Sequence, residues 1–107
     1  MIIYNITINI HESAHDAWMA WTKEFYIPGI LKTKKFDRAR IIKVLVEEDM
    51  GGVTYSIQFE TAQPELLQQY YKEDSDFFES EARKKFGELM LTFKTELELI
   101  SEHEINN

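Results

Sequence analysis

The sequence predicts an α+β fold in which a four-stranded antiparallel sheet carries two helices on one face. Apolar residues repeat with the two-residue period of strands in four segments, and with helical spacing in two others. The segments follow one another in the order β-α-β-β-α-β. With two right-handed crossovers, this order gives the ferredoxin-like βαββαβ arrangement.

The first strand and the first helix occupy the N-terminal part of the chain. From Ile2 to Ile10 the apolar residues stand on even positions, which is typical of a half-buried strand. Ser13 and Asp16 have the spacing of a capping box and predict the start of a helix. Pro28-Gly29 is expected to end or kink this helix. Its apolar residues recur at helical spacing: Ala14, Trp18, Trp21 and Phe25.

A β-hairpin is predicted next, from two alternating segments, residues 38–48 and 53–61, around the turn signal at 49–52. A loop with an even number of residues pairs position 46 with 55, 44 with 57 and 42 with 59. One buried face of the hairpin should then hold Ile42, Val44, Val46, Tyr55, Ile57 and Phe59.

The second helix is expected to begin at Pro64-Glu65, to be interrupted at Asp74, to resume at Ser75 and to end at Gly87. Asp74 lies within an apolar stripe, so it is a cap at the helix break, a salt-bridged charge or an acid in a pocket. Two pairs at i,i+4 spacing are expected to support the helix: Glu79 with Arg83 and Glu81 with Lys85.

The last strand is predicted from the alternation between Leu89 and Leu99, followed by a polar tail after Ser101. The whole chain, residues 1–107, is expected to form a single domain in which the tail 102–107 is frayed. Residues from three of the four strands should form the buried core together with the first helix: Ile6, Trp21, Ile57, Phe59 and Phe93.

The sheet face opposite the helices is expected to be polar but lightly charged. It should hold Asn5, Thr7, Asn9, Lys43, Leu45, Thr54, Ser56, Gln58, Thr92, Lys94 and Glu96. Such a composition suggests partial burial against a ligand or against a second copy of the chain, while a plain solvated face is the alternative. We expect a homodimer in which this face meets its symmetry mate.

Composition limits the partners and the chemistry. The 107 residues carry a formal net charge of −7, which opposes binding that depends on neutralising nucleic-acid or lipid phosphates. The absence of cysteine excludes disulfides, thiolate nucleophiles and iron–sulfur clusters. No apolar window is long enough for a membrane span, and the N-terminus lacks the features of a secretory signal, so we expect a cytoplasmic protein with neither nucleic-acid nor membrane partners.

A possible zinc motif occurs at His11-Glu12-Ser13-Ala14-His15, which matches H-E-x-x-H. That chemistry needs both histidines on one helical face, one turn apart. Here His11 is expected before the first helical turn and His15 within it. We therefore expect a solvated connection, no metal site and no cofactor.

Weak candidates for a functional site come from the remaining polar and aromatic residues. A histidine side chain suits proton transfer, and His15 stands near Trp18, while Tyr70 could supply a hydroxyl to a pocket. The candidate catalytic residues are His15, Tyr70 and Asp74, and the candidate ligand-binding residues are Trp18, Tyr71, Asn5, Gln58 and Lys94. The alternative for the aromatic residues is that they belong to the core or its rim.

Four segments carry a resemblance to known proteins: Met1-Ile2-Ile3-Tyr4-Asn5, residues 44–55, Gln68-Gln69-Tyr70-Tyr71 and Phe93-Lys94-Thr95-Glu96-Leu97. They look like a small bacterial family of unknown function, to which no catalytic or binding residue is assigned. More distantly, the layout resembles the dimeric α/β barrel superfamily, in which two ferredoxin-like protomers oppose their sheets. Members of that superfamily include cofactor-free monooxygenases, isomerases, haem-degrading enzymes and binding proteins.

Two classes of function remain. The first is a homodimeric protein with a structural role or a role in binding a small hydrophobic ligand. The second is a small cofactor-independent enzyme, a monooxygenase or an isomerase, that acts on a hydrophobic or aromatic metabolite. An enzyme or ligand binder should have a pocket of roughly 300 Å³ or more, lined by aromatic residues and a few polar groups.

Overall fold

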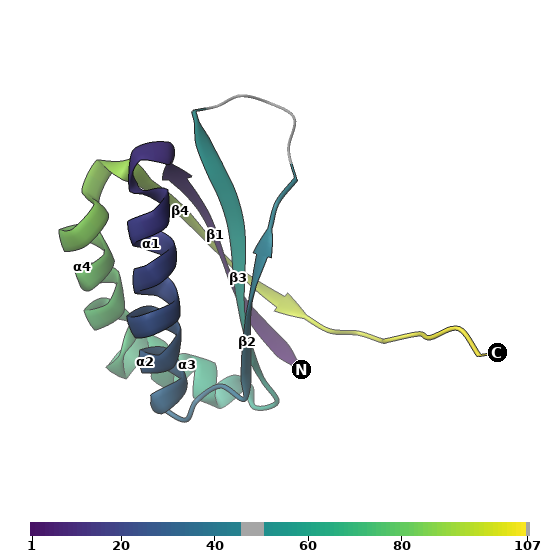
Figure 1. Ribbon diagram of the computed structural model, residues 1–107. Helices are drawn as coiled ribbons and strands as arrows, with labels where there is room; N and C mark the ends of the chain where they lie inside the picture. The colour runs from purple at the N-terminus through teal and green to yellow at the C-terminus, as the bar shows by residue number, and fades with distance from the viewer. Residues whose placement is uncertain (46–50, 107) are drawn as a thin grey trace.

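The expected α+β, ferredoxin-like fold is present in a computed structural model that describes residues 1–45 and 51–106. The strands form one antiparallel sheet in the order β2-β3-β1-β4, and all helices lie on one side of it (Figure 1). The elements are β1 (Ile2–His11), α1 (His15–Trp21), α2 (Ile27–Lys32), β2 (Arg38–Lys43), β3 (Gly52–Thr61), α3 (Pro64–Glu73), α4 (Ser75–Phe86) and β4 (Met90–Glu98).

The first helical stretch is continuous from residue 12 to residue 32. A 3₁₀ turn, Glu12–Ala14, precedes α1, and a π-helical segment, Thr22–Tyr26, joins α1 to α2. The helix does not end at Pro28-Gly29 as expected: a π segment precedes these residues, and the first turn of α2 tolerates the missing N–H of proline. At Gly29 an added Cβ would come within 2.8 Å of Cε1 of Phe78 on α4, so close packing of the two helices requires glycine there.

The expected capping box at Ser13 and Asp16 is wrong. The first turn is capped by His11, whose Nδ1 accepts a hydrogen bond of 3.1 Å from the backbone N–H of Ser13. His11 has an extended backbone just before the turn, and its imidazole nitrogen accepts from the free backbone N–H of the first turn, as a serine hydroxyl would.

The second helix behaves as expected at both ends and at its break. α3 begins at Pro64, the helix is interrupted at Asp74, and α4 begins at Ser75. Gly87 follows α4 with φ +52°, the left-handed conformation that favours glycine. The expected pairs with Arg83 and Lys85 do not form: Glu79 contacts Lys94 instead, and Glu81 lies 3.9 Å from Nζ of Lys84.

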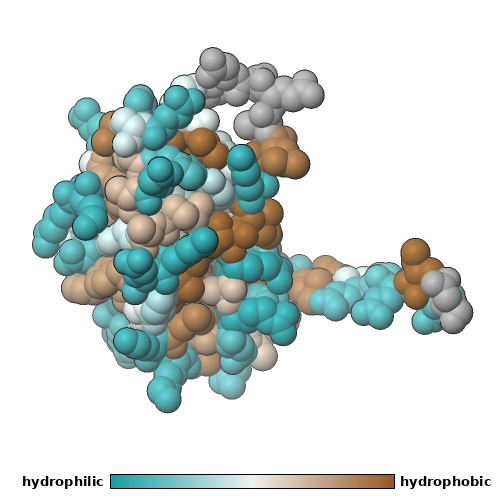
Figure 2. Space-filling view, viewed as in Figure 1, coloured by the Kyte–Doolittle hydropathy of each residue, from teal (hydrophilic) through white to brown (hydrophobic). Residues whose placement is uncertain are grey.

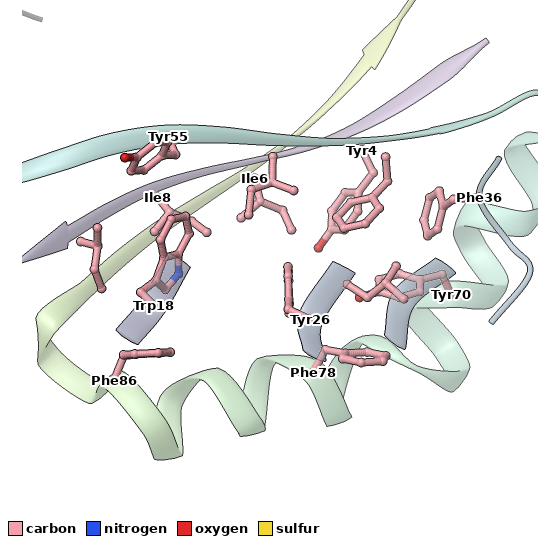
Figure 3. Packing of buried hydrophobic residues seen from close by; sticks show 14 of the residues in the cluster. Tyr4, Ile6, Ile8, Trp18, Tyr26, Phe36, Tyr55, Tyr70, Phe78 and Phe86 are labelled. Carbon is pink, nitrogen blue, oxygen red and sulfur yellow. The ribbon is translucent and has the colours of Figure 1, made fainter. Parts of the chain in front are cut away.

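The core lies between the sheet and the helices and is rich in aromatic rings (Figure 3). Ile6, Ile57 and Phe59 are fully buried, as expected. Trp21 is only partly buried at its edge, whereas Trp18 is fully buried. Phe93 is not a core residue: it is 70% exposed.

The register of the hairpin differs from the expected one. Ile41 pairs with Ile57 and Ala39 with Phe59, so the pairing is shifted by three residues, and Ile42 lies opposite Ser56. Apolar residues occupy both odd and even positions of this segment, so alternation alone does not fix the register. Val46 and the first two residues of the expected turn at 49–52 lie outside the described residues.

The expected side assignment is also wrong for three positions of β4 and for Lys43. Thr92 and Lys94 line a pocket beneath the helices, and Glu96 bonds to Tyr71 of α3. Lys43 pairs with Tyr55, whose side chain lies in the core, so Lys43 shares the helix side. On β4 the odd positions therefore face away from the helices, because Phe93 pairs with Thr7 and Leu91 with Asn9.

No helix in residues 1–45 and 51–106 is both long and apolar enough to span a bilayer.

Candidate functional site

A pocket of about 210 Å³ lies between the helices and the β1–β4 half of the sheet. It is smaller than the roughly 300 Å³ expected for a typical enzyme or ligand site. Its lining combines four aromatic rings with four polar side chains: Tyr4, Ile6, Ile8, Trp18, Trp21, Tyr26, Glu79, Ala82, Arg83, Met90, Thr92 and Lys94.

Ring stacking fixes the aromatic wall of the pocket. The ring of Trp18 stacks on Tyr55 at a centroid distance of 5.2 Å, and Trp21 stacks on Tyr26 at the same distance. Phe86 contacts Trp21 edge to face at 5.4 Å. Such contacts lock the rings in place, so the wall is preformed.

One polar atom of this wall has no partner. The indole Nε1 of Trp18 is buried and has no hydrogen-bond acceptor within the described part of the chain. Figure 3 shows this nitrogen on the side of the ring that faces Tyr26. A buried N–H without an acceptor costs about 1 to 3 kcal/mol, so an acceptor placed in the pocket gains binding energy here.

Charged residues line the pocket from α4 and β4. Lys94 forms an ion pair with Glu79, and burial lowers the pKa of Lys94. Arg83 also lines the pocket, and its side chain forms no ion pair within the described residues. One positive charge at the pocket is therefore left without a neighbouring carboxylate.

The candidate catalytic residue His15 lies outside this pocket, although it is well placed in a polar chain. Its Nε2 lies 2.7 Å from the hydroxyl of Tyr55, and its Nδ1 lies 2.9 Å from Oδ1 of Asp16. The other histidine of the H-E-x-x-H motif, His11, contacts Oγ of Ser13 at 2.9 Å. Among the described residues, no cluster of three or more His, Cys, Asp or Glu residues could hold a metal ion.

The candidates Tyr70 and Tyr71 on α3 also make contacts outside the pocket. Tyr70 is 1% exposed within the core, and burial raises the pKa of its hydroxyl well above the ordinary value. Tyr71 donates a hydrogen bond of 3.1 Å to Glu96, and burial together with this bond raises its pKa to about 12. Neither residue lines the pocket.

Asp74 is the salt-bridged charge among the three expected alternatives. Its carboxylate pairs with Nζ of Lys35, which also lies 2.6 Å from Oε2 of Glu73, and its side chain caps no helix. Burial lowers the pKa of Lys35, but the hydrogen bonds to Asp74 and Glu73 more than offset this effect, so the pKa is raised. These ion pairs thus connect the break between α3 and α4 to Lys35, which follows α2.

On the open face of the sheet, Asn5 and Gln58 belong to a continuous hydrogen-bond network. Ser56 donates to Asn5, Asn5 donates to Thr7 over 3.2 Å, Gln58 donates to Ser56 over 3.5 Å, and Arg40 donates to Gln58 over 3.0 Å. A separate bond of 3.1 Å runs from Nδ2 of Asn9 to Thr54. The polar side chains of this face therefore satisfy one another within a single chain.

Exposed apolar side chains flank that network on both sides. Those on β4 are Leu91, Phe93 and Leu97, which are 61%, 70% and 39% exposed, and Ile42 on β2 is 41% exposed. Figure 2 shows hydrophobic residues on the surface around β2, away from the helices. This open face is a second candidate site, since a large exposed apolar patch marks a contact surface.

Sequence reasoning found Trp18 and Lys94 but missed Trp21, Arg83 and Glu79 as pocket residues. Trp21 comes from α1 and the other two from α4, and they meet only through the tertiary fold. A signal did exist for Arg83 and Glu79, because both stand on α4 next to the apolar stripe. However, an ion pair between Glu79 and Arg83 within the helix explained the presence of these two residues equally well.

Comparisons with known proteins agree with the fold. No curated protein matches the chain. A dimeric ferredoxin-like protein from an uncultured marine organism shares 17% identity and a TM-score of 0.70, with 98% of this chain and 100% of that chain covered. An ethyl tert-butyl ether d (ethd) family protein from Bacillus halodurans shares 17% identity and a TM-score of 0.68, with 94% and 100% covered.

A family model described as "Domain of unknown function (DUF4286)" matches residues 1–100. The expected resemblance to a family of unknown function is thus confirmed. The chain belongs to the DUF4286 family.

Proposed function

We propose that this protein is a homodimeric binding protein whose two copies join through their open sheet faces. A single observation supports this most strongly: the uncovered face is apolar on its flanks and hydrogen-bonded to itself at its centre. On a monomer, Phe93 and Leu91 would remain in water. In a sheet-to-sheet dimer these side chains are buried.

The central network removes the main cost of such an interface. Burying an unpaired polar group is unfavourable, but Asn5, Ser56 and Gln58 already have partners within their own chain. At one end of the face Arg38 and Arg40 lie 3.4 and 3.6 Å from Oε2 of Glu60, which balances one of their two positive charges. The centre of the face can therefore lose water without leaving a polar group unpaired.

The fold of the chain also supports the proposal, because one similar structure is described as a dimeric ferredoxin-like protein. A twofold interface uses the same patch on both copies, so the patch must be complementary to itself. A face that is uncharged at its centre and carries exposed apolar side chains on both edge strands, β2 and β4, meets that requirement. The proposal keeps the single-domain organisation with a frayed tail and the cytoplasmic location expected from the sequence.

We favour binding over catalysis because of where the candidate proton-transfer groups lie. His15, Tyr70 and Asp74 are absent from the lining of the pocket, and each is used in another contact. The pocket instead offers aromatic walls and an unpaired N–H that can hold a ligand, and its one carboxylate, Glu79, forms an ion pair with Lys94.

Spin labels test the arrangement of the two copies, since the chain contains no cysteine of its own. A label on the Thr7→Cys variant sits at the centre of the open face, and one on Lys84→Cys sits on exposed α4. Pulsed electron paramagnetic resonance should give a much shorter distance between the two labels of the dimer for Thr7→Cys than for Lys84→Cys. A shorter distance for Lys84→Cys, or no dipolar coupling for Thr7→Cys, contradicts the proposal.

A further inference from the structure

We infer that the pocket between the helices and the sheet binds a small aromatic acid. Its ring lies against Trp18 and Trp21, and its carboxylate lies toward Arg83, which has no ion-pair partner within the described residues. The inference deepens the binding role proposed above. The pocket is lined by residues of one chain, so the inference does not depend on the dimer.

The unpaired indole specifies one feature of the ligand. Trp18 is 0% exposed, and its Nε1 can only donate a hydrogen bond. The group that meets it must therefore be an acceptor. A carboxylate oxygen is a strong acceptor and makes shorter bonds than a neutral one.

The charges around the pocket specify a second feature. Three charged residues line the pocket, and two of them, Lys94 and Glu79, neutralise each other in an ion pair. The positive charge of Arg83 is left without a partner in the described part of the chain. A planar guanidinium matches the geometry of a carboxylate. An anionic ligand would complete this arrangement, whereas a cationic ligand would add a second positive charge.

Shape and volume limit the rest of the ligand. Trp18 and Trp21, together with Tyr26, present ring surfaces to the pocket. A cavity of about 150 Å³ holds benzene. The 210 Å³ found here therefore suits one aromatic ring with a short acidic side chain.

Phenylacetate is a suitable probe, with phenethylamine as a cationic control that has a similar body. The chain has two tryptophans, so the nitrogen–proton NMR spectrum contains two indole resonances, and a Trp21→Phe variant assigns that of Trp18. Phenylacetate should shift the Trp18 resonance in a saturable way and bind at least about tenfold more tightly than phenethylamine. Unmoved indole resonances, or equal binding of the two probes, overturn the inference.

The variant Arg83→Gln tests recognition of the acid without disturbing the core, because Arg83 is exposed on α4. Its affinity for phenylacetate should fall about tenfold and its affinity for phenethylamine should not fall. Lys84→Gln is the matched control on the same helix and should bind like wild type. Unchanged phenylacetate binding in Arg83→Gln contradicts the proposed role of the guanidinium.

The same titration separates this inference from the proposed dimer. A monomeric wild-type protein that binds phenylacetate supports the pocket and contradicts the dimer alone. A dimeric wild-type protein that leaves both indole resonances unmoved contradicts the pocket alone.

Discussion

Lys94 on β4 forms an ion pair with Glu79 on α4, and this contact ties the edge strand of the sheet to the helix that covers it. Successive side chains of a strand point to opposite faces, so the contact also fixes the direction of Phe93. With Lys94 turned toward the helices, Phe93 must stand on the open face. One ion pair thus links the pocket on one side of β4 to the proposed dimer surface on the other.

Removing this ion pair should weaken the attachment of β4. In Lys94→Met the carboxylate of Glu79, whose side chain is 29% exposed, loses its partner, and the free energy of unfolding should fall by about 1 kcal/mol. Lys84→Met is the control, because its pair with Glu81 is longer and more exposed. Urea denaturation measures both changes, and equal losses in the two variants contradict the role of the contact.

The two tryptophans should differ in their contribution to stability. Trp18→Ala leaves a cavity beside a fully buried position and should cost about 3 to 5 kcal/mol. Trp21 stands at the edge of the core, so Trp21→Ala should cost less, about 1 to 2 kcal/mol. Thermal or urea unfolding of the two variants checks the order, and a larger loss for Trp21→Ala would be inconsistent with the described packing.

The charges at the break between α3 and α4 predict an acid-dependent stability. Hydrogen bonding to Lys35 lowers the pKa of Glu73, so this contact stabilises the folded state above about pH 4.5, the ordinary pKa of the carboxyl, and is lost as the pH falls through the lowered value. The difference in melting temperature between wild type and Lys35→Gln should therefore shrink from pH 6 toward pH 3.

A neighbouring lysine provides the control for that experiment. Lys34 is exposed and forms no ion pair within the described residues, so Lys34→Gln removes the same charge without removing the contact. Its difference from wild type should change little over the same pH range. A pH dependence that is the same for both variants would rule out the specific contact as its cause.

The helices and the central strand were predictable from the sequence because their signals are local. The break at Asp74 and the stop at Gly87 depend on a few adjacent residues, and β1 alternates without ambiguity from Tyr4 to Ile10. The expected buried positions on β1 and β3, such as Ile6 and Ile57, follow from that alternation.

The orientation of the two edge strands was not predictable in the same way. On β4 the apolar residues Leu91, Phe93 and Leu97 alternate as a core strand does, but they face away from the helices. Alternation shows that one face is apolar and does not say what covers it. On β2, Ile41 and Ile42 are adjacent, so either register buries an isoleucine.

The pocket depends on contacts that no local pattern contains. Trp18 and Arg83 come from different helices, and Lys94 comes from the last strand. Arg83 also has a suitable partner four residues earlier, Glu79, which the fold directs to Lys94 instead. Only the packing of α4 against β4 decides between the two pairs.

The most direct test of the proposed dimer is the mass of Phe93→Glu in solution, compared with Phe77→Glu. Both positions are exposed, at 70% and 54%, but Phe93 lies on the open face and Phe77 on α4. Light scattering across the micromolar range should give twice the 12.7 kDa chain mass for wild type and Phe77→Glu, and the single chain mass for a folded Phe93→Glu. A wild-type mass of 12.7 kDa throughout, or an unchanged dimer in Phe93→Glu, contradicts the account.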